Sequence, residues 1–180
     1  MVSPMGAHHI PDPAAPRVNA WRVLLIGRRP AHTLVRTGIL AALCFLVFRF
    51  ALIPVFVRGE SMEPTFRDGG LNMANTLVYR LRDPLPGEVV VIEMATRRTM
   101  YLKRVLATPG DTVYFQQGAL FVNGMRIEEP YVIQGGRWTT PPEQLGVDEY
   151  FVAGDNRSTP WEWHTMGVVN RSRIAGRILF

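Results

Sequence analysis

The sequence contains almost no lysine and almost no cysteine. Of its 20 basic residues, 19 are arginines and one is a lysine, Lys103. Arginine keeps its proton in a protein, whereas burial can lower the pKa of a lysine until it acts as a base. A GC-rich genome also depletes lysine, so the count alone assigns no role to Lys103. The single cysteine, Cys44, excludes an intrachain disulfide, and its apolar surroundings argue against a cysteine nucleophile.

Acidic residues are scarce at the start of the chain, where residues 1–36 hold five arginines and only one acid. Residues 1–33 are predicted to form a disordered, basic tail. The apolar run at residues 37–48 is shorter than the roughly 20 residues that cross hydrocarbon. However, the arginines beside it can reach outward, and the chain stays apolar to residue 57. We therefore predict a single transmembrane anchor with an interfacial segment over residues 34–57.

Two other interpretations of this apolar run fit less well. A cleaved signal peptide would need a small-x-small site after the run, and none follows. A buried core helix would show a polar face. The arginines before the run predict a cytoplasmic N-terminus and place residues 58–180 across the membrane. Since no later arginine cluster is interleaved with aromatic residues, nucleic acid is not an expected partner.

Beyond the anchor, the sequence predicts a mainly β, antiparallel domain. Asn123-Gly124 between two apolar runs is a strong hairpin signal. Residues 134–146 are rich in Gly, Pro and polar residues and are predicted to form a surface loop. The strand candidates are residues 87–92, 100–106, 112–115, 119–122, 125–127 and 149–152. Three tryptophans could belong either to the core or to a membrane interface: Trp138, Trp161 and Trp163.

Ser61 is a candidate nucleophile if a partner can take its proton. Two bases lie in the same predicted compartment, Lys103 and His164. A Ser-Lys dyad needs only Ser61 and Lys103, whereas a triad would combine Ser61 with His164 and an acid such as Asp155. The apolar neighbours of Lys103 favour its desolvation. Both arrangements remain open from the residues alone. The other histidines precede the anchor: His8, His9 and His32.

Five motifs occur in an order that resembles the bacterial type I signal peptidases, which are membrane-anchored Ser/Lys-dyad serine proteases. They are Gly-x-Ser-Met-x-Pro-Thr at 59–65, Gly-Glu-Val-Val at 87–90, Tyr-Leu-Lys-Arg-Val at 101–105, Pro-Gly-Asp at 109–111 and Gly-Asp-Asn-Arg at 154–157. The resemblance extends from about residue 49 to residue 180. The serine and lysine motifs together are highly specific, although either alone is weak.

The resemblance implies a signal-peptidase fold and an endopeptidase that removes signal peptides at the outer face of the bacterial cytoplasmic membrane. Ser61 would be the nucleophile and Lys103 the general base. Secretory preproteins and the phospholipid membrane would be its partners, with no cofactor and no metal. The substrate would lie extended between residues 56–58 and 99–102. The pocket for the small side chain before the cut would be lined by Met62, Phe66, Tyr101 and Leu102.

The chain departs from the family pattern after Gly-Asp-Asn-Arg. Where relatives carry a serine, an aspartate and an arginine, this sequence has Pro160, Glu162 and His164. We expect Ser158 or Thr159 to replace the missing hydroxyl near the lysine, and a Glu162–His164 pair to replace the Asp–Arg pair. In addition, Gly59 stands where some relatives have serine. This leaves the N–H of Ser61 as the expected oxyanion donor.

Three alternatives share part of this pattern. Self-cleaving repressors also use Ser and Lys, but they carry an N-terminal DNA-binding domain where this chain has an apolar run. A specialised pilin or conjugation maturation protease would share every motif. An inactive membrane-anchored binding module is favoured only by Pro160. The sequence makes no prediction of the oligomeric state.

Overall fold

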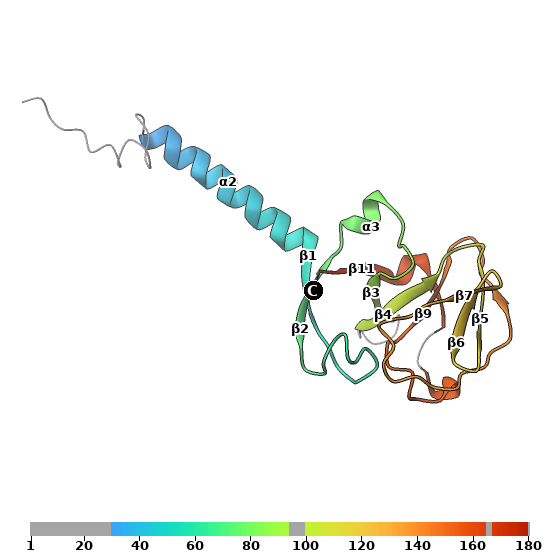
Figure 1. Ribbon diagram of the computed structural model, residues 1–180. Coiled ribbons are helices and arrows are strands. Elements are labelled where there is room, and N and C mark those ends of the chain that lie inside the picture. The colour runs from blue at the N-terminus through green and yellow to red at the C-terminus, as the bar shows by residue number, and fades with distance from the viewer. Residues whose placement is uncertain (1–29, 94–99, 165–166, 180) are drawn as a thin grey trace, which may run out of the picture. The chain divides into compact units, whose positions relative to one another are not determined.

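The computed structural model describes residues 30–93, 100–164 and 167–179 (Figure 1). The chain divides into two units, Met1–Phe45 and Leu46–Phe180. Most of the predicted N-terminal tail lies outside the described residues, but residues 30–33 belong to helix α2 and not to a disordered tail, so that boundary is wrong. Helix α2 is the described part of the first unit and continues into the second.

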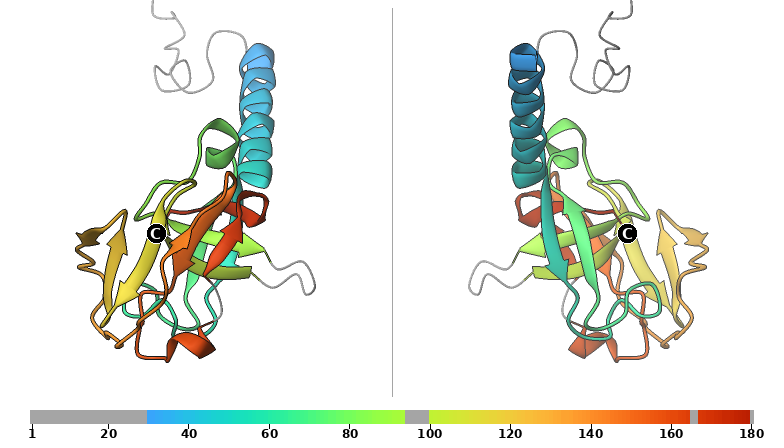
Figure 2. Two further views of the ribbon diagram at one scale, coloured as in Figure 1. Left: turned by 90° about the vertical axis from the view of Figure 1, so that its right-hand side faces the viewer. Right: turned by 90° about the vertical axis from the view of Figure 1, so that its left-hand side faces the viewer.

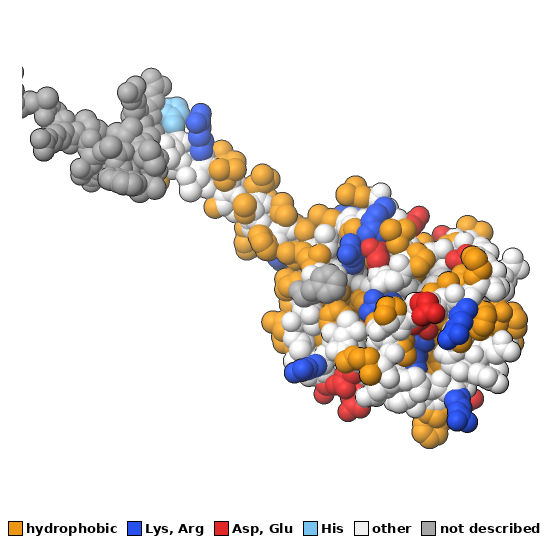
Figure 3. Space-filling view, viewed as in Figure 1, with side chains coloured by type: hydrophobic (Ala, Val, Ile, Leu, Met, Phe, Trp, Pro, Cys, Tyr) orange, Lys and Arg blue, Asp and Glu red, His pale blue; other side chains and the backbone are white. Residues whose placement is uncertain are grey.

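Helix α2 spans Pro30–Ala51 and begins at a proline, which suits a first helical position. Its surface is apolar and exposed, as Leu40 at 60% and Phe45 at 69% exposure illustrate (Figure 3). Residues Ala31–Ala51 are long and apolar enough to cross a membrane. At 1.5 Å per residue they extend about 30 Å, the thickness of the hydrocarbon core. The end of the predicted interfacial segment is instead a β-strand that starts at Leu52.

The second unit contains two antiparallel sheets. The larger has the order β1-β2-β11-β3-β4-β9-β10 and the smaller has the order β7-β6-β5-β8. The larger sheet consists of β1 (Leu52–Phe56), β2 (Leu71–Asn75), β3 (Val89–Glu93), β4 (Met100–Ala107), β9 (Glu149–Ala153), β10 (Val168–Asn170) and β11 (Ile174–Ile178). The smaller consists of β5 (Thr112–Gln116), β6 (Ala119–Val122), β7 (Met125–Ile127) and β8 (Glu143–Gln144). Each strand pairing is antiparallel.

This architecture confirms the predicted fold class, a mainly antiparallel β domain after one N-terminal apolar helix. The six strand candidates between residues 87 and 152 are present, and the predicted hairpin at Asn123-Gly124 joins β6 to β7. The extended segment expected at 56–58 is a strand only at Phe56, where β1 ends. Strands β2, β8, β10 and β11 were not anticipated. The short helices are α3 (Val78–Leu81), η1 (Trp161–Trp163) and η2 (Arg171–Arg173).

The prediction of a surface loop over residues 134–146 is wrong in part. The segment supplies strand β8, and two of its apolar side chains, Trp138 and Leu145, are buried at 4% and 3% exposure. They join Phe115 and Leu120 of the smaller sheet in one cluster with Phe151 of β9. This cluster fastens the smaller sheet to the larger one. Of the other tryptophans, Trp161 packs against this cluster and Trp163 is exposed.

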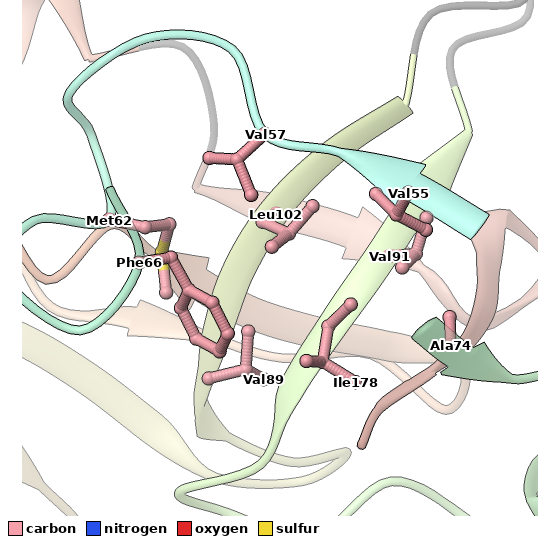
Figure 4. Close-up of a cluster of buried hydrophobic side chains, with 9 residues drawn as sticks. All are labelled: Val55, Val57, Met62, Phe66, Ala74, Val89, Val91, Leu102 and Ile178. Atoms are coloured by element: carbon pink, nitrogen blue, oxygen red, sulfur yellow. The ribbon is translucent and has the colours of Figure 1, made fainter. Parts of the chain in front are cut away.

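A second cluster packs between the larger sheet and the segment that links β1 to β2 (Figure 4). In it, Val89 of β3 lies beside Phe66 of that linking segment, and Val91 lies beside Val55 of β1. Leu102 of β4 and Met62 of the linking segment belong to the same cluster. The linking segment and η1 both lie at the end of the domain away from α3, as the two side views show (Figure 2). The predicted nucleophile lies in this linking segment.

Candidate active site

Ser61 lies in the loop of residues 57–70 between β1 and β2. Hydrogen bonds close the loop, from Val57 N to Gly70 O at 2.8 Å and from Gly69 N to Val57 O at 3.0 Å. Gly59 has φ +89°, which favours glycine, and its N–H donates to Asp68 Oδ1 at 2.7 Å. The loop that carries Ser61 is therefore closed on itself rather than free.

Lys103 lies in β4 opposite Val90 of β3, and only 2% of its surface is exposed. Its Nζ donates to Ser61 Oγ at 2.8 Å, although 42 positions separate the two residues. Burial lowers the pKa of Lys103 to about 8, and the charge of Asp155 opposes this shift. A lysine with this pKa can lose its proton near neutral pH. The structure thus joins the two residues that the sequence singled out.

The segment Gly154–Asn156 contacts the backbone of Ser61, whereas Lys103 contacts its side chain. Asn156 N–H donates to Ser61 O at 3.1 Å, and Asn156 Nδ2 donates to Glu60 O at 3.2 Å. A Cβ on Gly154 would lie 2.1 Å from Ser61 O. No side chain fits at that distance, so the contact requires glycine. This segment positions the serine without touching its hydroxyl.

Asp155 connects the same segment to β4. Its buried carboxylate accepts from Arg104 at 2.8 Å (Nε) and 2.6 Å (Nη2), and from Thr65 Oγ1 at 2.5 Å. Arg104 therefore directs its charge to Asp155 on the face opposite Lys103, as strand alternation requires. Since the hydrogen bonds of Asp155 go to Arg104 and Thr65 and not to His164, the Ser-His-Asp triad that the sequence left open is not assembled.

Arg157 is a buried cation with a complete set of partners. Its guanidinium pairs with Glu129 at 2.6 Å and donates to Gly154 O at 2.6 Å. Its Cζ also lies 5.1 Å from the ring centroids of Phe115 and of Trp138. The arginine of the Gly-Asp-Asn-Arg motif therefore ties the serine-holding segment to the smaller sheet.

The structure corrects the expected replacement pairs. Glu162 is exposed, and no ion pair joins it to His164 in the described part of the chain, so the predicted Glu162–His164 pair is wrong. His164 Nε2 instead accepts from Gly154 N–H at 3.3 Å. Burial, with the nearby charges of Lys103 and Arg157, lowers the pKa of His164 to about 3.

The hydroxyl expected near Lys103 is also placed differently. Ser158 Oγ donates to Asn156 Oδ1 at 2.6 Å, and Thr159 accepts from Trp138 Nε1 at 2.7 Å through its carbonyl oxygen. Both residues are exposed, as is Pro160. The Lys103 amine donates to Ser61 itself.

The predicted pocket residues lie beside the dyad. Met62, Phe66 and Leu102 are buried in the cluster of Figure 4, and Tyr101 is half-buried. Residues 94–99, which include the first position of the predicted substrate strand, lie outside the described residues. Within β4, the pairing with β9 starts only at Arg104, so Met100–Lys103 pairs on one side with β3. The pocket itself stays a prediction.

Sequence reasoning missed the part played by Thr65, Asp155 and Asn156 in bracing the serine loop. The signal was present as the Gly-Asp-Asn-Arg motif, whose polar residues between apolar runs indicate buried hydrogen bonds. Glu129 gave no such signal, because two acids before a proline, Glu128 and Glu129, are ordinary surface composition.

Comparison with known proteins decides the family. The family model described as signal peptidase, peptidase S26, matches residues 31–180, well over half of the chain. The chain belongs to this signal peptidase family. The resemblance predicted from the motifs is thereby confirmed, and membership places the chain among serine endopeptidases.

Three relatives show the extent of the similarity. A probable signal peptidase I-2 of Synechocystis is 33% identical over 128 residues, which cover 68% of this chain and 59% of the relative. Signal peptidase I of Bacillus amyloliquefaciens is 33% identical over 153 residues, which cover 79% of this chain and 82% of the relative. Signal peptidase IB of Staphylococcus aureus is 28% identical over 165 residues, which cover 82% of this chain and 86% of the relative.

A solved structure, a signal peptidase I of Enterococcus faecalis, is similar with a TM-score of 0.43 and 20% identity. The alignment covers 53% of this chain and 97% of that chain.

Proposed function

We propose that this protein removes N-terminal signal peptides from secreted preproteins, with Ser61 as nucleophile and Lys103 as general base. The observation that carries the proposal is the 2.8 Å contact between Lys103 Nζ and Ser61 Oγ, with the amine buried. Three relatives from three genera are named signal peptidases, which supports the substrate class.

In the proposed reaction, neutral Lys103 takes the proton of Ser61 as Oγ attacks the carbonyl carbon before the cut. The N–H of Ser61 is the proposed donor to the oxyanion. The lysine ammonium then gives its proton to the leaving amine, and the signal peptide remains as an ester on Ser61. Lys103 next takes a proton from water as the water attacks the ester carbonyl carbon. It gives that proton to Ser61 Oγ as the ester bond breaks and the peptide acid leaves, which restores the serine hydroxyl and the neutral amine.

The preprotein would bind as an added strand along the unpaired side of Met100–Lys103 in β4. In this mode, backbone hydrogen bonds hold an extended peptide and side-chain pockets select the sequence. Met62, Phe66, Tyr101 and Leu102 are the proposed pocket residues. Met62, Phe66 and Leu102 are packed in one apolar cluster and Tyr101 is half-buried, which supports an apolar floor suited to a small side chain.

We further propose that helix α2 is a single-pass anchor with its N-terminus in the cytoplasm and residues 58–180 outside the cytoplasmic membrane. The arginines that precede the helix support this orientation. Protease added to spheroplasts should degrade residues 58–180. Full protection of that region would contradict the topology.

The function is tested with the full-length protein in detergent, incubated with a purified preprotein. Sequencing the new N-terminus of the product should locate one cut after a small-x-small sequence. Ser61→Ala should remove the cut, while Ser172→Ala, an exposed serine in η2, should leave it. Binding of the preprotein without any cut would favour the inactive binding module instead. Cutting of one preprotein out of many would favour a specialised maturation protease.

A further inference from the structure

His164 stands where the resemblance places an arginine, and its surroundings differ from those of a charged group. Its imidazole ring packs against two indoles, with centroid distances of 4.7 Å to Trp138 and 5.8 Å to Trp161. The Trp161 ring is nearly parallel to it, at an interplanar angle of 19°. Stacking of this kind fixes the plane of the imidazole and hence the direction of Nε2.

Resting on the function proposed above, we infer that His164 is a positioning residue whose unprotonated Nε2 holds Gly154, and through Gly154 the backbone of Ser61. The hydrogen bond from Gly154 N–H to His164 Nε2 is 3.3 Å long. In a neutral imidazole one nitrogen accepts and the other carries the proton. This contact therefore assigns the proton to Nδ1.

The peptide groups around Gly154 are fixed on both sides. The N–H of Gly154 goes to His164, and its carbonyl oxygen accepts from Arg157 Nε at 2.6 Å. The Gly154 Cα lies so close to Ser61 O that an added Cβ would approach to 2.1 Å. A shift of Gly154 by a few tenths of an ångström would therefore move the serine backbone. His164 acts on the reaction through this contact, without touching substrate.

An arginine in place of His164 could not perform this task, because guanidinium has no acceptor atom. The departure from the family pattern is thus a change in hydrogen-bond chemistry, from donor to acceptor. The charged groups that act on the imidazole are Lys103 of β4 and Arg157, both cations. Glu162 on the neighbouring η1 is exposed and forms no ion pair with it in the described part of the chain. Burial and these two charges keep the acceptor form throughout the neutral pH range.

Two substitutions separate the acceptor from the packing. His164→Phe keeps an aromatic ring against Trp138 and Trp161 but has no acceptor. His164→Gln can present an amide oxygen near the position of Nε2. Since a lost hydrogen bond typically changes an equilibrium by about two- to tenfold, we expect kcat of the Phe variant to fall by up to about tenfold. KM should stay within about twofold because the substrate contacts β4.

The Gln variant should recover kcat to within about twofold of the parent, although it loses the packing of the imidazole ring against the two indoles. Equal kcat in Phe and parent, equal losses in Phe and Gln, or a change confined to KM would each overturn the inference. A parent enzyme that cuts no preprotein would refute the proposed function instead.

The second measurement needs no activity. In full-length protein labelled with ¹⁵N-histidine in detergent micelles, the signal of His164 is assigned by its absence in His164→Gln. We expect Nδ1 to carry the proton and Nε2 to stay unprotonated from pH 5 to pH 9. A proton on Nε2, or titration of the ring within this range, would overturn the inference whether or not preprotein is cut.

Discussion

Two buried cations lie near Ser61, one in contact with its hydroxyl and the other with Gly154 of the segment that holds its backbone, and their surroundings are opposite. Lys103 and Arg157 are each only 2% exposed. Arg157 has a carboxylate partner in Glu129, a carbonyl partner in Gly154 and two aromatic faces. Lys103 contacts the hydroxyl of Ser61, and no carboxylate of the described residues lies within ion-pair distance of its amine.

The two cations differ in whether their buried charge is compensated, and this determines their protonation. A buried charge costs several kcal/mol unless it is paired, and Arg157 is paired and so remains charged. Lys103 lacks this compensation, so its pKa falls to about 8 and the neutral amine becomes accessible. Arg104, one residue further along β4, satisfies its charge on Asp155 at the opposite face. The fold therefore keeps its structural cations paired and leaves its proposed base unpaired.

The largest effect is expected where the base is replaced by a cation that cannot lose its proton. Lys103→Arg should reduce kcat by about 10⁴-fold or more, as should Ser61→Ala, because either change removes the proposed proton transfer. Cleavage of a preprotein is measured from single-turnover rates. Arg126→Lys on exposed β7 is the control and should retain full activity. Substantial cleavage by Lys103→Arg would exclude the lysine as base.

Breaking the ion pair of Arg157 with Glu129 should reduce the stability of the protein rather than act on the chemical step. Glu129→Gln leaves Arg157 buried without its carboxylate, and we expect a loss of about 3–5 kcal/mol in the free energy of unfolding. Asp83→Asn is the matched control: it removes a carboxylate from the ion pair with Arg171, but Asp83 is 77% exposed, and the loss should stay below about 1 kcal/mol. Denaturant titration compares the two. Equal losses of unfolding free energy in Glu129→Gln and Asp83→Asn would mean that burial does not make the Arg157–Glu129 pair more important than the exposed Arg171–Asp83 pair.

Removing the unpaired cation, Lys103, should stabilise the protein rather than destabilise it. The folded-state pKa of Lys103 is about 8 against 10.5 for the free side chain, so the folded state binds the proton less well. Its stability is therefore lower below pH 8 and recovers as pH rises toward 10.5. We expect the free energy of unfolding of Lys103→Met to exceed that of the parent by about 1–3 kcal/mol at pH 7. This difference should disappear near pH 10.5, the ordinary value for the free side chain. A destabilised Lys103→Met at pH 7 would contradict the uncompensated burial of the amine.

The smallest effect concerns the rival base. His164→Ala should cut preprotein within about tenfold of the parent, a factor worth about 1.4 kcal/mol of barrier. The reason is that His164 contacts Gly154 and the two indoles rather than Ser61. Single-turnover rates and a melting curve are needed. If the folded His164→Ala variant were as inactive as Ser61→Ala while Lys103→Ala stayed active, a Ser-His mechanism would replace the dyad.

The resemblance of the serine and lysine motifs to the signal peptidases predicted the pairing of Ser61 with Lys103, which the residues alone had left open beside a Ser-His-Asp triad. The hairpin at Asn123-Gly124 was predictable from local pattern, since a two-residue turn has few solutions. By contrast, β11 joins β2 and β3, which are distant in the chain. Pairings of this kind depend on tertiary packing rather than on local pattern.

The environment of His164 could not be predicted from the sequence. Its position suggested an ion pair with Glu162, two residues away. However, the packing of Trp138 against Trp161 encloses the imidazole and leaves the carboxylate in water. Trp138 itself was placed in a surface loop, because its neighbours are Gly, Pro and polar residues. Only the folded cluster around Phe115 reveals that this segment packs its tryptophan against the smaller sheet.

The central claim is that Lys103 is the uncompensated base, and a direct titration of its amine tests it most sharply. Because the chain contains a single lysine, labelling with ¹³C- or ¹⁵N-lysine gives one side-chain signal without assignment. Its NMR shift is followed against pH in the full-length protein. We expect a midpoint near pH 8, the value to which burial lowers the pKa of Lys103, with the rise in kcat/KM at the same midpoint. A midpoint at or above the ordinary lysine value of about 10.4 would contradict the account.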